Sequence, residues 1–173
     1  MIRRREFITL LGGAAVAWPL ASRAQQARMP VLGFLAPGSP ETLGLSVVAL
    51  RKGLSEAGLV EGRDLIIEFR WARDQVDQLP KLAAELVQRQ ITVIYALASV
   101  SARAAKTATE SIPIVFLSGD DPVAAGLVAS LGRPGGNMTG INLLAGGLGT
   151  KRLGLLRELV PTARLIGLLD NPK

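Results

Sequence analysis

The side chains best suited to ligand chemistry are serines and aspartates that follow apolar segments. Ser99 and Ser101 stand at the start of an alanine-rich segment, and Asp120 and Asp121 lie in the turn that begins at Ser118. A hydroxyl and the free N–H groups of a helix start can hold a ligand carboxylate, whereas an aspartate facing a cleft favours a ligand ammonium. The same residue types are also common helix caps and turn formers. The local sequence leaves both interpretations open.

The residue types that the chain lacks exclude most enzyme chemistry. The 173 residues include no histidine and no cysteine, which excludes imidazole bases, thiol nucleophiles, thiolate or imidazole metal sites and disulfides. A hydrolase is the enzyme alternative, but no G-x-S-x-G elbow is present. We therefore expect a binding protein without covalent chemistry and without a metal.

Two glycine-rich patterns bear on cofactors, and neither fits. In the segment 146–151, Thr150 separates Gly149 from Lys151, whereas a phosphate loop needs Gly-Lys-Ser/Thr in direct succession. No G-x-G-x-x-G follows the first apolar segment, so a dinucleotide site is not expected either. We expect no cofactor.

The charge of the chain does not indicate a nucleic-acid partner. The formal net charge is +6, and half of it comes from four arginines and one glutamate near the N-terminus. Only 4% of the residues are aromatic, and no basic and aromatic side chains cluster in the sequence. Nucleic acid is therefore not an expected partner.

Residues 1–24 have the layout of an export signal. A basic start is followed by an uncharged stretch from 8 to 22 that is too short to span a bilayer, and then by the small residues Ser22 and Ala24. Arg4 and Arg5, directly before Glu6, resemble the twin-arginine motif. These features predict the twin-arginine translocase as an export partner, cleavage after Ala24 and a product free in the periplasm.

Apolar periodicity predicts the elements that would position the serines and aspartates. Strands and helices alternate, which indicates an α/β fold with a doubly wound parallel sheet, a Rossmann-like lobe. The expected strands are 30–36, 64–71 (partly exposed, as at a sheet edge), 91–97, 112–117, a strand ending near 144, and 165–169. The expected helices are 41–57, 76–89, 99–106, a short one opened by Asp121-Pro122, and 151–159. Ligands of such sheets bind beyond the carboxyl ends of the strands, the side on which Ser118 and Asp121 are expected.

Four separated motifs occur in a recognisable order. They are VLGFLAPGSPET, GLSEAGLVEGRDLIIEFRWA, IPIVFLSGDDPVAAGLVASLGRPGGNMTG and KRLGLLRELVP. Together they resemble the periplasmic substrate-binding proteins of ABC transporters, in the group related to tryptophan/tyrosine-binding proteins. The resemblance implies a type I periplasmic-binding fold, in which two lobes close on a small molecule, such as an amino acid or a related small carboxylate. It also implies a membrane permease as partner and ligand contacts at Ser39, Ser99 and the turn from Ser118 to Asp121.

The same resemblance implies a domain division. Residues 25–144 would form lobe one, and residues 145–173 would form the crossover and the beginning of lobe two. Family members are about twice as long as this chain, so we expect a chain truncated within the second lobe. A functional solute-binding protein and a non-functional fragment of one both remain open.

Overall fold

The computed structural model describes residues 29–143 and 148–167. The predicted signal peptide, with Arg4 and Arg5, lies outside the described residues. All described helices and strands belong to one unit, residues 31–173. Within the described part of the chain, no helix is both long and apolar enough to cross a membrane.

Five parallel strands form a single sheet. They are β1 (Val31–Ala36), β2 (Ile66–Trp71), β3 (Val93–Leu97), β4 (Ile114–Ser118) and β5 (Met138–Asn142). The strand order is β2-β1-β3-β4-β5, and every neighbouring pair is parallel. This confirms the predicted α/β doubly wound sheet. Because all strands run the same way, their carboxyl ends lie at one edge, which we call the ligand edge.

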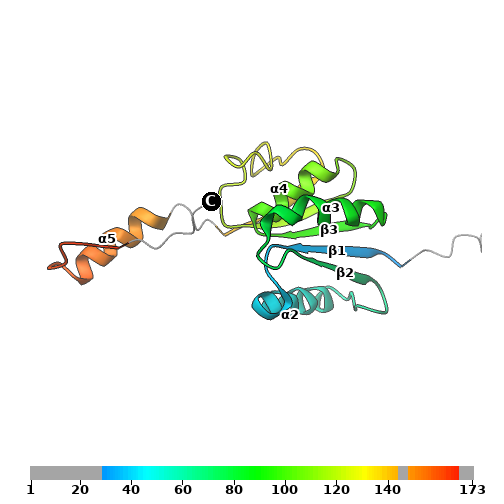
Figure 1. The fold of residues 1–173 in the computed structure, drawn as a ribbon, viewed down its shortest axis with the longest axis horizontal. Coiled ribbons are helices and arrows are strands. Elements are labelled where there is room, and N and C mark those ends of the chain that lie inside the picture. Colours follow the sequence, from blue (N-terminus) through cyan, green and yellow to red (C-terminus); the bar gives the residue numbers. More distant parts are fainter. Residues whose placement is uncertain (1–28, 144–147, 168–173) are drawn as a thin grey trace, which may run out of the picture. The chain divides into compact units, whose positions relative to one another are not determined.

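Helices cover both faces of the sheet (Figure 1). The helix α2 (Pro40–Glu56) covers one face near β1 and β2, and α3 (Leu79–Gln88) and α4 (Ser99–Ala108) cover the other. A 3-10 turn, Val76–Gln78, leads into α3, and α5 (Gly149–Leu159) follows β5 in sequence. These bounds confirm four of the predicted helices, and Pro80 lies in the first turn of α3, as its missing N–H requires.

Each face of the sheet has its own apolar core. On the α2 face, Val47 packs with Phe34 and Ile67, and the other predicted inward residues of this helix are partly buried against them. On the opposite face, alanines of α4 and leucines of α3 pack on Ile94 and Ile114. The two cores hold the strand ends in fixed positions.

The strand β2 is an edge strand, as its alternation predicted. It lies at the end of the strand order and pairs only with β1 within the described sheet. Leu65 and Ile67 are buried, whereas Ile66 between them is 45% exposed. Alternate burial is the pattern of a strand with one face toward solvent.

The predicted helix after Asp121 is wrong. Residues 122–126 form consecutive turns instead, and the N–H groups of Leu127 and Val128 both donate to the carbonyl of Pro122, at 2.8 and 3.3 Å. Gly126 has φ +66°, outside the right-handed helical region. A helix this short gains little from propagation, so the glycine and the burial of Leu127 and Val128 decide the conformation.

The predicted strand 165–169 is not found in its described part. Residues 165–167 lie in no strand, and residues 168 and 169 lie outside the described residues. Leu165 is 90% exposed. A strand needs a hydrogen-bonded neighbour, and none of the described strands pairs with this segment.

Candidate ligand-binding site

Three segments leave the sheet at the ligand edge, each just after a central strand. They are the loop from β1 to α2 with Ser39, the junction of β3 and α4 at Ala98, and the turn after β4 from Ser118 to Asp121. The structure therefore brings all six predicted contact residues to the C-terminal ends of neighbouring strands. Those residues are Ser39, Ser99, Ser101, Ser118, Asp120 and Asp121.

Ser39 is the residue before the first turn of α2 and has an extended backbone. Its N–H donates to Oγ1 of Thr42 at 3.0 Å, and its own hydroxyl lies 3.4 Å from the same oxygen. A hydrogen bond from the Ser39 side chain is the main cause that lowers the pKa of the exposed Glu41 carboxyl, followed by a backbone hydrogen bond and by the charge of Arg73. Ser39 thus organises the first turn of α2.

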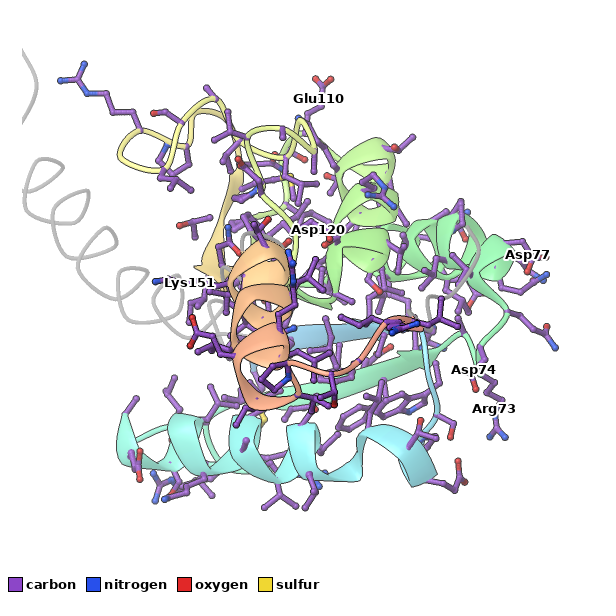
Figure 2. All side chains as sticks on the ribbon, turned by 90° about the vertical axis from the view of Figure 1, so that its left-hand side faces the viewer. Arg73, Asp74, Asp77, Glu110, Asp120 and Lys151 are labelled. Atoms are coloured by element: carbon purple, nitrogen blue, oxygen red, sulfur yellow. The ribbon has the colours of Figure 1, made fainter. Side chains whose placement is uncertain are left out.

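The loop after β2 also reaches this edge, a position that the sequence pattern did not predict. The N–H groups of Arg73 and Asp74 donate to the carbonyls of Gly38 and Pro37, at 3.0 and 2.8 Å. Figure 2 shows Arg73 and Asp74 next to each other, and both have positive φ. A non-glycine residue rarely adopts positive φ, and no local motif in Ala-Arg-Asp-Gln signals it.

Ser118 ends β4 and is completely buried. Its hydroxyl donates to the carbonyl of Asp120 at 2.8 Å and accepts from the N–H of the same residue at 3.1 Å. A third partner, the hydroxyl of Ser99, lies 2.8 Å from it. One hydroxyl therefore joins the start of α4 to the turn after β4.

The direction of the Ser99–Ser118 hydrogen bond follows from counting protons. A serine hydroxyl has one proton and two lone pairs. Because Ser118 gives its proton to the carbonyl of Asp120, the proton between the two serines must come from Ser99. The expectation that Ser99 offers a proton to a ligand carboxylate thus does not fit this geometry.

The start of α4 has no side-chain cap. The residue before the helix is Ala98, with φ +71°, and its N–H donates to the carbonyl of Leu117 at 2.9 Å. The interpretation of Ser99 and Ser101 as caps is therefore wrong, since both lie inside the helix. The hydroxyl of Ser101 is fully buried and has no hydrogen-bond partner among the described residues.

Asp121 forms the turn that follows it, and Asp120 does not. Oδ1 of Asp121 accepts from the N–H groups of Val123 and Ala124, at 2.8 and 3.2 Å. The backbone of Asp120 is held by Ser118, while the residue is exposed. Among the described residues, no hydrogen bond or ion pair engages the Asp120 carboxylate.

Aromatic side chains gather on the α2 face beside this edge. Phe69 and Trp71 of β2 stack with their ring centroids 5.7 Å apart, and Phe34 packs against both. A cavity of about 350 Å³ between α2 and β2 is lined by Pro40, Trp71 and other residues of these two elements. The alternation of 64–71 could have predicted an inward Phe69, but not the cavity, which depends on where α2 lies.

No three histidine, cysteine, aspartate or glutamate side chains within residues 29–143 and 148–167 form a group that could hold a metal ion. The ligand edge instead combines backbone N–H groups, hydroxyls and carboxylates. Such a set can hold a small zwitterion by hydrogen bonds and charge, without chemistry on it.

Known proteins match this chain in sequence and in fold. The model of the family described as "ABC transporter substrate binding protein" matches residues 35–173. A tyrosine-binding protein of Clostridioides difficile is 37% identical over 120 residues, which cover 69% of this chain and 34% of that protein. The chain thus spans about a third of the length of this curated relative.

Solved structures show the same architecture. A conserved domain protein from Vibrio cholerae has a TM-score of 0.71 at 28% identity, over 78% of this chain and 45% of the other. The ligand-free, open structure of a Clostridium difficile substrate binding protein with adhesive properties has a TM-score of 0.61 at 29% identity, with the same coverage. An ABC domain in complex with L-Trp, from Streptococcus pneumonia, has a TM-score of 0.61 at 26% identity, over 66% of this chain and 39% of that one.

Proposed function

The chain belongs to the family of ABC transporter substrate binding proteins, and from this premise we propose that it forms the first lobe of an exported solute-binding protein. Such a protein captures a small molecule and delivers it to a membrane permease without covalent chemistry. Residues 25–144 would form lobe one, and residues 145–173 the crossover and the beginning of lobe two. The observation that carries the proposal is that the hydroxyls of Ser39, Ser99 and Ser101 and the aspartates Asp120 and Asp121 come together at the ligand edge from three segments that follow neighbouring strands.

We propose an amino acid as the ligand, with its carboxylate at the start of α4. The first-turn N–H groups of that helix have no side-chain cap, and a helix N-terminus attracts negative charge. The buried hydroxyl of Ser101 in the same turn has no partner among the described residues. One relative is named a tyrosine-binding protein and one solved neighbour holds L-Trp, which favours an aromatic amino acid.

Export by the twin-arginine translocase is part of the proposal. Arg4 and Arg5 precede Glu6, Phe7 and Ile8 in the way that the export motif requires. Signal cleavage after Ala24 would release the protein into the periplasm, where a solute-binding component meets its ligand.

A titration of the chain with L-tyrosine and with L-tryptophan, followed by amide chemical shifts in NMR, tests the proposal. We expect shift changes at residues 98–101 and 118–121. The described residues supply one wall, so a few hydrogen bonds of about 0.5–1.5 kcal/mol each barely exceed the cost of association. A Kd of about 1 mM is expected, on the order of −4 kcal/mol.

A fusion protein sharpens the test. Fusing a second lobe, taken from the tyrosine-binding relative, after Lys173 should tighten the Kd to about 1 μM, because closure would remove the ligand from water. Micromolar binding by the unfused chain would contradict the single-wall argument. Shift changes confined to residues far from the ligand edge would contradict the proposed site.

A further inference from the structure

Ser118 has a role that its burial and its hydrogen bonds define together. The residue is 0% exposed and its hydroxyl already has three hydrogen bonds, so this hydroxyl has no position left for a ligand, yet it contacts two residues of the ligand edge. All three hydrogen-bonding positions of that oxygen are occupied: one by its own proton, given to Asp120, and two by protons received. The Ser118 hydroxyl therefore makes all the hydrogen bonds it can, and it links two segments of the proposed site.

The hydrogen bonds of Ser118 also fix the direction of the Ser99 proton. Ser99 is itself buried, with 6% of the residue exposed, and its proton points inward to Ser118, so only lone pairs remain for a ligand group that reaches its oxygen. An oxygen with lone pairs alone repels a carboxylate and accepts from an ammonium, an amide N–H or water. Ser118 thus determines which kind of ligand group Ser99 can receive.

The hydrogen bonds of Ser118 also fix the backbone of Asp120. Its backbone N–H and carbonyl both bind Ser118, which holds the residue in one conformation. Its exposed carboxylate has no partner among the described residues. The Asp120 backbone is linked to the Ser99 oxygen by two hydrogen bonds through Ser118, which brings an acceptor hydroxyl and an acidic residue to the same part of the edge.

We propose that Ser118 is a positioning residue that makes this part of the ligand edge an acceptor, which selects the cationic ammonium end of a ligand over an anionic end. This assignment rests on the proposed function, and it adds which charged end of the ligand binds at which part of the site. The ligand carboxylate then goes to the N–H groups of α4, and the ammonium goes to Ser99 and Asp120. A zwitterion is oriented by the two subsites together.

Three indole probes separate the two ends. L-tryptophan has both charges, tryptamine has the ammonium alone and indole-3-propionate has the carboxylate alone. NMR titration of the full chain should show amide shifts at Asp120 with the first two probes. Indole-3-propionate should shift the first turn of α4 but not Asp120.

Variants then identify the contribution of Ser118. Ser118→Ala should weaken tryptamine binding about tenfold, because Ser99 regains a free proton and Asp120 loses its anchor, and should not weaken indole-3-propionate binding. Ser118→Thr keeps the hydroxyl and should restore tryptamine binding. The control is Thr109→Val, which removes the hydroxyl of another buried residue, at the opposite end of α4, and should leave the binding of all three probes unaffected.

Amide hydrogen exchange of Asp120 tests the anchoring without a ligand. Ser118→Ala should raise its exchange rate at least tenfold, whereas Thr109→Val should not change it. An unchanged exchange rate overturns the positioning role, whatever the probes do. Tryptamine affinity within twofold of the parent chain in Ser118→Ala overturns the selection of an ammonium.

Failure of the proposed function gives a different result. If none of the three probes shifts the ligand edge of the parent chain, both the solute-binding proposal and the ammonium subsite are overturned. The exchange of Asp120 in Ser118→Ala still decides whether Ser118 anchors this turn.

Discussion

Ser101 is a buried residue whose hydroxyl makes no hydrogen bond to another described residue. The packing of α4 against its neighbours also shields the oxygen of this hydroxyl from water. An unpaired buried hydroxyl costs about 1–3 kcal/mol, because its hydrogen bonds to water are lost on folding. In the proposed site, a ligand or an ordered water would supply the missing partner. The unpaired hydroxyl also leads to a prediction about the stability of the fold.

Ser101→Ala should increase the free energy of unfolding by about 1 kcal/mol, since it removes the unpaired group and keeps the helix. Urea unfolding followed by circular dichroism measures the change. Thr109→Val is the control, and it should lower stability by about 1 kcal/mol because two backbone N–H groups lose their acceptor. A loss of stability in Ser101→Ala would show that the hydroxyl has a partner in solution.

The hydrogen bonds of the Asp64 carboxyl predict that the loop before β2 is sensitive to acid. Oδ2 of Asp64 accepts from the N–H of Val60 at 2.9 Å and binds the guanidinium of Arg63. These hydrogen bonds, that of Arg63 first, lower the pKa of the Asp64 carboxyl. A carboxyl with a lowered pKa in the folded state binds its proton more weakly there, so its stabilisation is present at neutral pH and is lost as the pH falls.

The expected result is a fall in unfolding free energy below about pH 4 that is smaller in Asp64→Asn than in the parent chain. Urea unfolding at several pH values between about 2.5 and 7 checks it. Asp77, an exposed aspartate in the 3-10 turn, provides a matched control as Asp77→Asn. Equal pH profiles for the parent and Asp64→Asn would contradict the prediction.

The pairing of β4 with β5 depends on a glycine. A Cβ at position 140 would overlap the carbonyl oxygen and ring of Phe116, the residue opposite it in the sheet. Backbone that approaches this closely cannot shift without breaking the ladder. The segment between the two strands, residues 119–137, is long and irregular, and Asn137 at its end donates to the carbonyls of Thr109 and Ile112, so β5 is held by this anchor and by its ladder with β4.

Gly140→Ala should therefore lower the free energy of unfolding by about 1–3 kcal/mol, the range of overpacking. The matched control is Gly132→Ala, where a Cβ would meet nothing within 4 Å and φ is not positive. Thermal unfolding compares the two variants. Equal melting temperatures would mean that β5 moves away from β4 without cost.

The helix α5 contributes little to the cores of the described sheet. None of its residues is buried, and Leu153, Leu155, Leu156 and Leu159 are between 42 and 78% exposed. Several exposed leucines on one helix promote association between copies of the chain. The proposed division at residue 145 assigns this helix to the second lobe.

Deleting residues 145–173 should leave the melting temperature within about 2 °C and improve solubility, because the deletion removes exposed apolar surface and no buried residue of the sheet. Circular dichroism and light scattering measure the two effects. A sharp loss of folded signal would mean that this segment packs on lobe one, contrary to the proposed division.

At the scale of the whole molecule, the proposed function depends on export, for which residues 1–24 are the proposed leader. A solute-binding protein acts where its permease takes up solute, so the proposed function requires transport of the chain across the inner membrane. The twin-arginine route carries folded proteins, and a lobe with parallel strands of distant sequence would cross after folding.

Replacing Arg4 and Arg5 together by lysine should prevent export, because the translocase requires the arginine pair. Cell fractionation with an antibody to the chain measures the periplasmic share. Arg3→Lys, which leaves the pair intact, is the control. Periplasmic accumulation of the double variant at the parent level would indicate general secretion.

The sequence by itself determined the elements and their arrangement to a large extent. Apolar runs of five or six residues marked the strands, and spacings of three and four placed Val47 inward on α2, because periodic burial is a local property of the chain. The four separated motifs indicated the family that the comparisons confirm. Placing the serines and aspartates at one edge followed from parallel strands alone.

Only the tertiary structure decided what those residues do. Ser99 resembled a helix cap in the sequence, but it donates to Ser118, which is 19 positions away and reaches it through the pairing of β3 with β4. Asp121 had the pattern of a helix start, but the burial of Leu127 and Val128 and the conformation of Gly126 gave turns. A hydrogen bond between distant residues and the cost of leaving apolar side chains exposed depend on the whole fold, so no local window of sequence contains them.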